Sequence, residues 1–337
     1  MSDHPSSHLS TGNEVSRRDF LKATAVTIAS PSIAEGLPLH QDPQEAVKKD
    51  SETLVKSLYE TFTPEQKKIC AFPFGHPLRS KVDNNWFITK ARVDKTFTPD
   101  QQAMIREIFV GLHSPDYADV VMKQVEHDSG NRGFGNCSIA IFGEPGTGKF
   151  EFVLTGRHVT RRCDGDSVKG MAFGGPIFYG HAAHSFNEKP DHPDNAYWFQ
   201  ALRANKVFGA LDGKQRKLAL RNDPKKERGT KTVELGGKEL PGISMEQLSE
   251  DQKELVRRTM GDLLAPFRKA DVDETMKCIE TSGFDQLSMA FYQNRDIGKD
   301  GVWDVWQLQG PDMLWFFRGA PHVHAWAHVR EPLRKKS

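Results

Sequence analysis

The fold is decided by the C-terminal stretch GVWDVWQLQGPDMLWFFRGAPHVHAWAHV, residues 301–329. Three segments of this stretch alternate in polarity with a period of two and are rich in aromatic side chains, as β-strands are. They are residues 302–308, 313–318 and 322–329. Farther toward the N-terminus, the same pattern predicts strands at 138–142, 150–158 and 287–292. We therefore expect a largely antiparallel sheet.

Helix starts with one shared signature recur along the chain. Each has Ser, Thr or Asp at the N-cap and Gln three residues later, so that the two side chains can bond free backbone N–H groups at the helix start. The four pairs are Thr63 with Gln66, Thr98 with Gln101, Asp212 with Gln215, and Ser249 with Gln252. The expected fold class is thus α+β, a largely antiparallel β-sheet with several peripheral helices.

Two of these helix starts look alike: residues 61–64 and 96–99 both have the sequence Thr-Phe-Thr-Pro. The likeness is compatible with an internal repeat. Convergent capping chemistry explains it more simply, because both stretches place Thr at the N-cap and Pro in the first turn.

The N-terminal region carries Ser16-Arg17-Arg18-Asp19-Phe20-Leu21-Lys22, followed by a weakly apolar run at 23–29. Adjacent arginines before a short apolar region are typical of a twin-arginine export signal, and the alternative is a disordered basic tail. We assign residues 1–36 to the signal, 37–60 to a linker or partly ordered segment, and 61–330 to a single α+β domain. The prediction is a periplasmic or secreted protein that uses the twin-arginine translocase as its partner during export.

The composition excludes several classes of protein. Lys and Arg number 46 against 45 Asp and Glu, so the chain lacks the overall basic field of a nucleic-acid-binding protein. No stretch approaches the roughly 18 to 20 apolar residues of a membrane-spanning helix, so we expect no stable membrane span in the mature form. The basic segment 216–231 is interpreted as a solvated loop, with a patch for an anionic partner as the alternative.

One apparent nucleotide-binding motif is rejected. Residues 143–149, Gly-Glu-Pro-Gly-Thr-Gly-Lys, match a phosphate-binding loop, but Phe150 stands where that loop needs a Ser or Thr hydroxyl for magnesium. The residues that follow alternate like a strand, whereas a phosphate loop must lead into a helix. We therefore predict the turn of a β-hairpin here.

Four cysteines are far apart in the sequence, without the Cys-x-x-Cys spacing of a zinc ribbon or redox pair: Cys70, Cys137, Cys163 and Cys278. A disulfide between Cys137 and Cys163 is compatible with an oxidising compartment. Buried free thiols are the favoured interpretation.

Histidines near the C-terminus indicate a metal site. On a strand, His322, His324, Trp326 and His328 project from one face, and neighbouring imidazoles can bind one ion. His158 stands at the end of another predicted strand, and His181 and His184 lie in a Gly/Pro-rich stretch, 174–184. The alternative is a half-buried strand whose histidines bond to the backbone.

The motifs resemble an exported bacterial family known only as domain of unknown function 3500. They are the Arg-Arg signal, 152–160 ending in Gly-Arg-His-Val-Thr, the run 173–183, the helix start 211–220 and the ending 318–326, so the resemblance covers roughly residues 60–330. Many members carry Gly-His-His where this chain has Gly156-Arg157-His158. The resemblance implies no reaction; it implies that these motifs form one site.

The leading hypothesis is an exported metalloprotein, a metal-dependent oxidoreductase or hydrolase acting on an unknown small-molecule substrate. Without cysteine ligands, copper fits at least as well as zinc or iron. Trp326 would form a wall of the pocket, and Arg157 and Glu151 are weak candidates for catalytic roles. The alternatives are a non-catalytic periplasmic binding or interaction module and a metal carrier. The proposed ligands are His158, His181, His322 and His324, with His184, His192 and His328 as weaker candidates.

Overall fold

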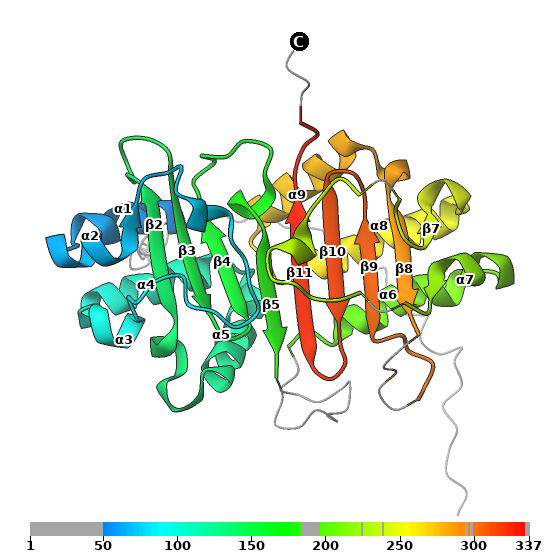
Figure 1. Cartoon of the computed structure of the whole chain (residues 1–337), viewed down its shortest axis with the longest axis horizontal. Helices are drawn as coiled ribbons and strands as arrows, with labels where there is room; N and C mark the ends of the chain where they lie inside the picture. Colours follow the sequence, from blue (N-terminus) through cyan, green and yellow to red (C-terminus); the bar gives the residue numbers. More distant parts are fainter. Residues whose placement is uncertain are drawn as a thin grey trace, which may run out of the picture. The chain divides into compact units, whose positions relative to one another are not determined.

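A computed structural model covers the chain and describes residues 50–182, 196–223, 225–237, 239–293, 296 and 299–333 (Figure 1). It confirms the α+β class. The predicted export signal lies outside the described residues, as do His184 and His192. None of the described helices is long and apolar enough to cross a membrane.

The strands form one sheet in the order β1-β2-β3-β4-β5-β11-β10-β9-β8-β6, with β7 paired to β8 (Figure 1). Neighbouring strands are antiparallel except for the pairs β1·β2 and β6·β8. The sheet is therefore largely antiparallel, as predicted. The strands are β1 Ala71–Phe72, β2 Ser138–Gly143, β3 Phe150–Gly156, β4 Val159–Cys163, β5 Ile177–His181, β6 Leu220–Arg221, β7 Ile243–Ser244, β8 Ser288–Tyr292, β9 Val305–Gln309, β10 Met313–Arg318 and β11 Val323–Val329.

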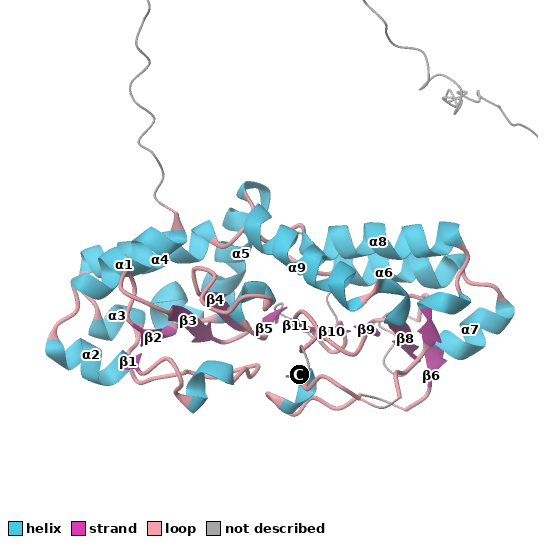
Figure 2. Ribbon diagram, turned by 90° about the horizontal axis from the view of Figure 1, so that it is seen from above, coloured by secondary structure: helices cyan, strands magenta, loops and turns pink. Residues whose placement is uncertain are grey.

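Helices cover one face of this sheet, and Figure 2 shows α1, α4, α5, α6, α8 and α9 along the same side of the strands. The largest apolar core lies between them and the sheet; it joins Ile105 of α4 and Leu263 of α8 to strand residues such as Ile139 and Phe317. The helices are α1 Ser51–Glu60, α2 Pro64–Cys70, α3 Val93–Thr96, α4 Pro99–Gly111, α5 Pro115–Asp128, α6 Phe199–Ala210, α7 Gly213–Ala219, α8 Glu250–Leu264 and α9 Lys269–Ser282.

The opposite face is covered by irregular segments. Val82 and Val233 pack there against Phe178 and Trp326, and Ile88 packs against Val153. The interpretation of 216–231 as a solvated loop is wrong in part, because residues 216–219 belong to α7 and residues 220–221 form β6. Within the segment 37–60, which we expected to be a linker or partly ordered, residues 51–60 form α1, whose Val55 and Leu58 are fully buried.

The two halves of the described chain repeat one plan. Each half begins with a helix, then a short helix with a capping box, and then an edge strand that is parallel to its neighbour. These are followed by a second capped helix, another helix and four antiparallel strands. Thus α1, α2, α4 and α5 correspond to α6, α7, α8 and α9. The strand order is mirrored about the central pair β5·β11, so the sheet has approximate two-fold symmetry.

The capping glutamines make the correspondence specific. Gln66 and Gln101 donate to each other's side-chain oxygen at 2.8 and 3.1 Å, and Gln215 and Gln252 do the same at 2.9 and 2.8 Å. All four N-caps form complete capping boxes. The likeness between 61–64 and 96–99 is capping chemistry within one half, whereas the structural repeat relates each half to the other.

The rejected nucleotide motif forms the predicted hairpin. Residues 143–149 connect the antiparallel strands β2 and β3. Gly143 has φ of 76°, and a Cβ there would lie 2.0 Å from the Lys149 carbonyl oxygen, so the turn requires glycine. All four cysteines are buried free thiols, with no disulfide between Cys137 and Cys163.

An acidic cluster between the β4 end and α9 gives a pH prediction. Burial, with the negative charges of Asp164 and Asp166 adding to it, raises the pKa of Glu274 to about 7. A raised carboxyl pKa contributes stability that is complete below the unfolded value of about 4.5 and is lost as pH rises through 7. Glu274→Gln should therefore match the wild type at pH 4.5 and exceed its unfolding free energy by about 1–2 kcal/mol at pH 8.

Urea unfolding at the two pH values measures this difference. Glu280→Gln, exposed on the same helix, is the matched control and should leave the pH dependence unchanged. Parallel stability curves for Glu274→Gln and the wild type would contradict the prediction.

Candidate metal centre

His158 is positioned by the turn between β3 and β4. Its φ is 55°, so the predicted strand 150–158 ends at Gly156 and His158 belongs to the turn. The His158 backbone N–H donates to the Asn84 carbonyl at 3.1 Å, and the His158 carbonyl accepts from Gly180 N–H at 3.1 Å. A Cβ at Gly180 would lie 2.3 Å from the Val323 carbonyl oxygen, so the close approach of β5 to β11 beside His158 requires glycine.

His322 directly precedes β11 and His324 lies on it. Strand β11 is next to β5 at the centre of the sheet (Figure 1). Their Nε2 atoms lie 2.9 Å apart, and their ring centroids lie 4.6 Å apart. The His158 ring centroid is 5.0 Å from each of theirs. The turn and the strand thus bring three imidazoles together, which we call the His158 group.

Two carboxylates orient this group from behind. Asp128, the last residue of α5, accepts from His158 Nδ1 at 2.7 Å. Glu227 accepts from His324 Nδ1 at 2.8 Å. With Nδ1 donating to a carboxylate, each ring presents the lone pair of Nε2 toward the other imidazoles. A carboxylate behind a histidine in this way raises its basicity and fixes its direction, as in metal sites.

Glu227 connects several groups. Its Oε1 also accepts from Trp326 Nε1 at 2.7 Å, and its Oε2 lies 3.2 Å from Arg318 Nη1. Burial alone would raise the pKa of Glu227, but the His324 hydrogen bond and the positive charge of Arg318 lower it to about 2. Glu227 is therefore an anion that fixes His324, Trp326 and Arg318 relative to one another.

The electrostatics keep His322 and His324 neutral. Burial, together with the neighbouring imidazoles and Arg318, lowers the pKa of His322 to about 3. Burial also lowers the pKa of His324 to about 4, although Glu227 opposes the shift. Neutral imidazole is the form that binds metal, so no proton has to leave these rings at neutral pH.

The His158 group has the chemistry and the spacing of a metal site. One ligand nitrogen from each of the three residues lies within 4.8 Å of the others. Bonds of about 2.0–2.1 Å to a tetrahedral ion place imidazole nitrogens about 3.4 Å apart. Small side-chain shifts would therefore bring the three nitrogens to the separation that such an ion requires. Three histidines leave the fourth tetrahedral position open, and His322 is only partly buried. The group could hold a metal ion with an exchangeable position.

His181 joins a different group, so the expected four-histidine site is not what the structure shows. In the β5·β11 ladder, His181 is directly opposite Val323, and residues directly opposite each other project from the same face. Val323 belongs to the core under the helices, whereas Trp326 belongs to the core on the other face. His181 therefore projects from the opposite face to His324 and lies near His127 and Asp128.

The remaining candidates lie apart from the His158 group. His328 shares the face of Trp326, but its Nδ1 is 3.0 Å from the Val233 carbonyl oxygen. Arg157 is exposed in the β3–β4 turn. Glu151 is fully buried, and it pairs with Arg79 and Arg162. The structure thus gives Glu151 a place in an ion-pair network and leaves it outside the histidine cluster.

Sequence reasoning missed the two carboxylates. Asp128 follows His127 at a helix C-terminus, and this adjacent pair was the available signal. Glu227 is an acidic residue within a basic segment. It reaches His324 only because that segment crosses the sheet. Both contacts span long separations in the sequence.

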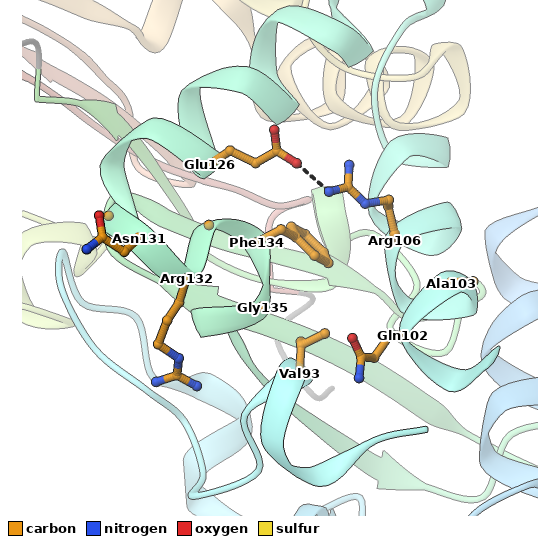
Figure 3. A pocket seen from close by; sticks show the side chains of 11 residues that line it. Val93, Gln102, Ala103, Arg106, Glu126, Asn131, Arg132, Phe134 and Gly135 are labelled. Atoms are coloured by element: carbon orange, nitrogen blue, oxygen red, sulfur yellow. Dashed lines mark hydrogen bonds and ion pairs between the residues drawn. The ribbon is translucent and has the colours of Figure 1, made fainter. Parts of the chain in front are cut away.

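A separate groove between α3, α4 and α5 has a volume of 630 Å³ (Figure 3). Its charges are paired, Arg106 with Glu126 and Arg132 with Asp94. It contains no residue of the His158 group, so we do not assign the chemistry to it.

Together these features define an α+β protein with a clustered, carboxylate-backed histidine site. Residues 44–336 match the family described as "Protein of unknown function (DUF3500)", and the chain belongs to that family. No curated protein and no solved structure matches the chain.

Proposed function

We propose that the protein is an exported metalloprotein whose His158 group binds a divalent transition-metal ion and supports a metal-dependent hydrolysis or oxidation. The observation that carries this proposal is the meeting of three imidazoles, two of them held by carboxylates. Export is proposed from the twin-arginine motif at 16–22.

Each residue has a defined task in this proposal. His158 and His324 present Nε2 because Asp128 and Glu227 hold their Nδ1 protons. The partly buried His322 stands on the side from which a substrate reaches the group. A bound ion would supply a Lewis acid that lowers the pKa of a coordinated water molecule. Because the donors are nitrogens without thiolates, zinc, copper and iron all fit.

The test is the metal content of the full chain purified from its native compartment. The His322→Ala/His324→Ala variant should lose about one ion per chain relative to the wild type, because two of three ligands are removed. His328→Ala, on the same strand face, is the matched control and should keep its metal. Added metal should also raise the melting temperature of the wild type and the control by more than that of the double variant.

Equal metal content in the double variant and the wild type would refute the His158 group as a metal centre. Recovery of the protein from the cytoplasm alone would refute export. A metal-loaded protein that shows no turnover in an activity screen would favour a metal carrier over an enzyme.

A further inference from the structure

A second cluster of potential ligands lies on the helix-covered side of the sheet. His127 and Asp128 end α5, and His181 ends β5. One ligand atom from each lies within 4.8 Å of the others. We infer that His127, Asp128 and His181 form a second cation site, which binds a divalent first-row transition-metal ion and is connected to the His158 group through Asp128.

The two oxygens of Asp128 have different surroundings. Oδ2 accepts from His158 Nδ1 at 2.7 Å, from Gln124 Nε2 at 2.8 Å and from Ala182 N–H at 3.1 Å. Among the described residues, no hydrogen bond reaches Oδ1, although the Asp128 side chain is completely buried. A buried carboxylate oxygen without a donor is costly, and a cation would compensate it.

The histidines stand beside that oxygen. His127 Nδ1 lies 3.5 Å from Asp128 Oδ1, and the ring centroids of His127 and His181 are 6.2 Å apart. His181 is 1 % exposed, whereas the His127 side chain is 32 % exposed. The site is thus closed on the sheet side and accessible at the end of α5.

The donor set indicates the class of cation. Two imidazoles and one carboxylate suit zinc and ferrous iron, and leave positions open for water or another ligand. Calcium and magnesium are disfavoured because they prefer sites made of oxygens alone.

Asp128 makes the two sites interdependent. One of its oxygens holds His158, and the other is offered to the second cation. Asp128→Asn should therefore weaken both sites, while loss of His127 should empty only the second. Weakening of only one site by Asp128→Asn would contradict this connection through Asp128.

The experiment is a calorimetric titration with Zn²⁺ of the full chain after removal of bound metal by a chelator. The wild type should bind about two equivalents, and His127→Ala about one. His127 is chosen because its partly exposed side chain can be shortened without opening the core. His76→Ala, a histidine outside both groups, is the control and should keep two equivalents.

The two variants distinguish failure of the second site from failure of the His158 group. If only the second site exists, His127→Ala abolishes binding and His322→Ala/His324→Ala does not. If only the first exists, His127→Ala binds as much Zn²⁺ as the wild type, and the inference is overturned. If His127→Ala and His322→Ala/His324→Ala each bind about one equivalent of Zn²⁺, one fewer than the wild type, both sites are supported.

Discussion

Replacing Glu151 by Ala should lower the unfolding free energy by about 3–5 kcal/mol and leave the metal content unchanged. The Glu151 side chain is completely buried on β3, where its two oxygens meet Arg79 and Arg162. Removing the carboxylate leaves the buried guanidinium of Arg162 without its counter-charge. An uncompensated buried charge is much more costly than a broken surface ion pair.

Arg162 cannot easily move away to relieve that cost. Its guanidinium also donates to backbone carbonyls of Pro176, Arg79 and Lys81, so it ties β4 to the segments that cover the sheet. Glu151→Gln, which keeps the shape but not the charge, should cost less than Glu151→Ala. Urea unfolding gives both values. Unchanged stability in Glu151→Ala combined with lost activity would restore the catalytic role for which the sequence made Glu151 a weak candidate.

The elements predicted well from the sequence are those set by local chemistry. The six strands follow a period of two in apolar and aromatic residues, and the structure places a strand in each predicted segment. The four capping signatures locate helix starts because a cap needs only side chains within one turn. The hairpin at 143–149 follows from Phe150 and the alternation after it.

The site was predicted only in part because it depends on pairing between distant strands. His158 lies close to His322 and His324 because the segments that carry these histidines come together where β5 pairs with β11. The face of His181, however, depends on the register of β5 against β11, and a shift of one residue would reverse it. No local pattern sets that register.

The repeat explains where the two histidine groups lie. The halves meet at β5·β11, and both groups take their ligands from the elements around this junction. His158 and His181 belong to the first half, while His322 and His324 belong to the second. The capping glutamines are equivalent in both halves, whereas the ligands are not. The duplicated plan thus supplies the framework, and the junction supplies the site.

Glu227→Gln should weaken metal binding at the His158 group by about 10- to 100-fold, which corresponds to about 1.4–2.7 kcal/mol. The amide oxygen can still accept one hydrogen bond from His324, but the negative charge that raises the basicity of the ring is lost. Arg318 would also lose the negative charge that lies 3.2 Å from its Nη1, so its positive charge would act more strongly on the ion. Both effects act against cation binding.

The measurement is a competition titration with a Zn²⁺ chelator in the His127→Ala background, so that only the His158 group reports. Glu234→Gln removes an exposed charge from the same segment and serves as the matched control. It should bind as tightly as the background protein, since surface charges at a distance are screened by salt. Equal affinity in the two variants would mean that Glu227 acts on the packing of Trp326 and not on the ion, and the carboxylate-backed histidine would then lose its role in metal binding.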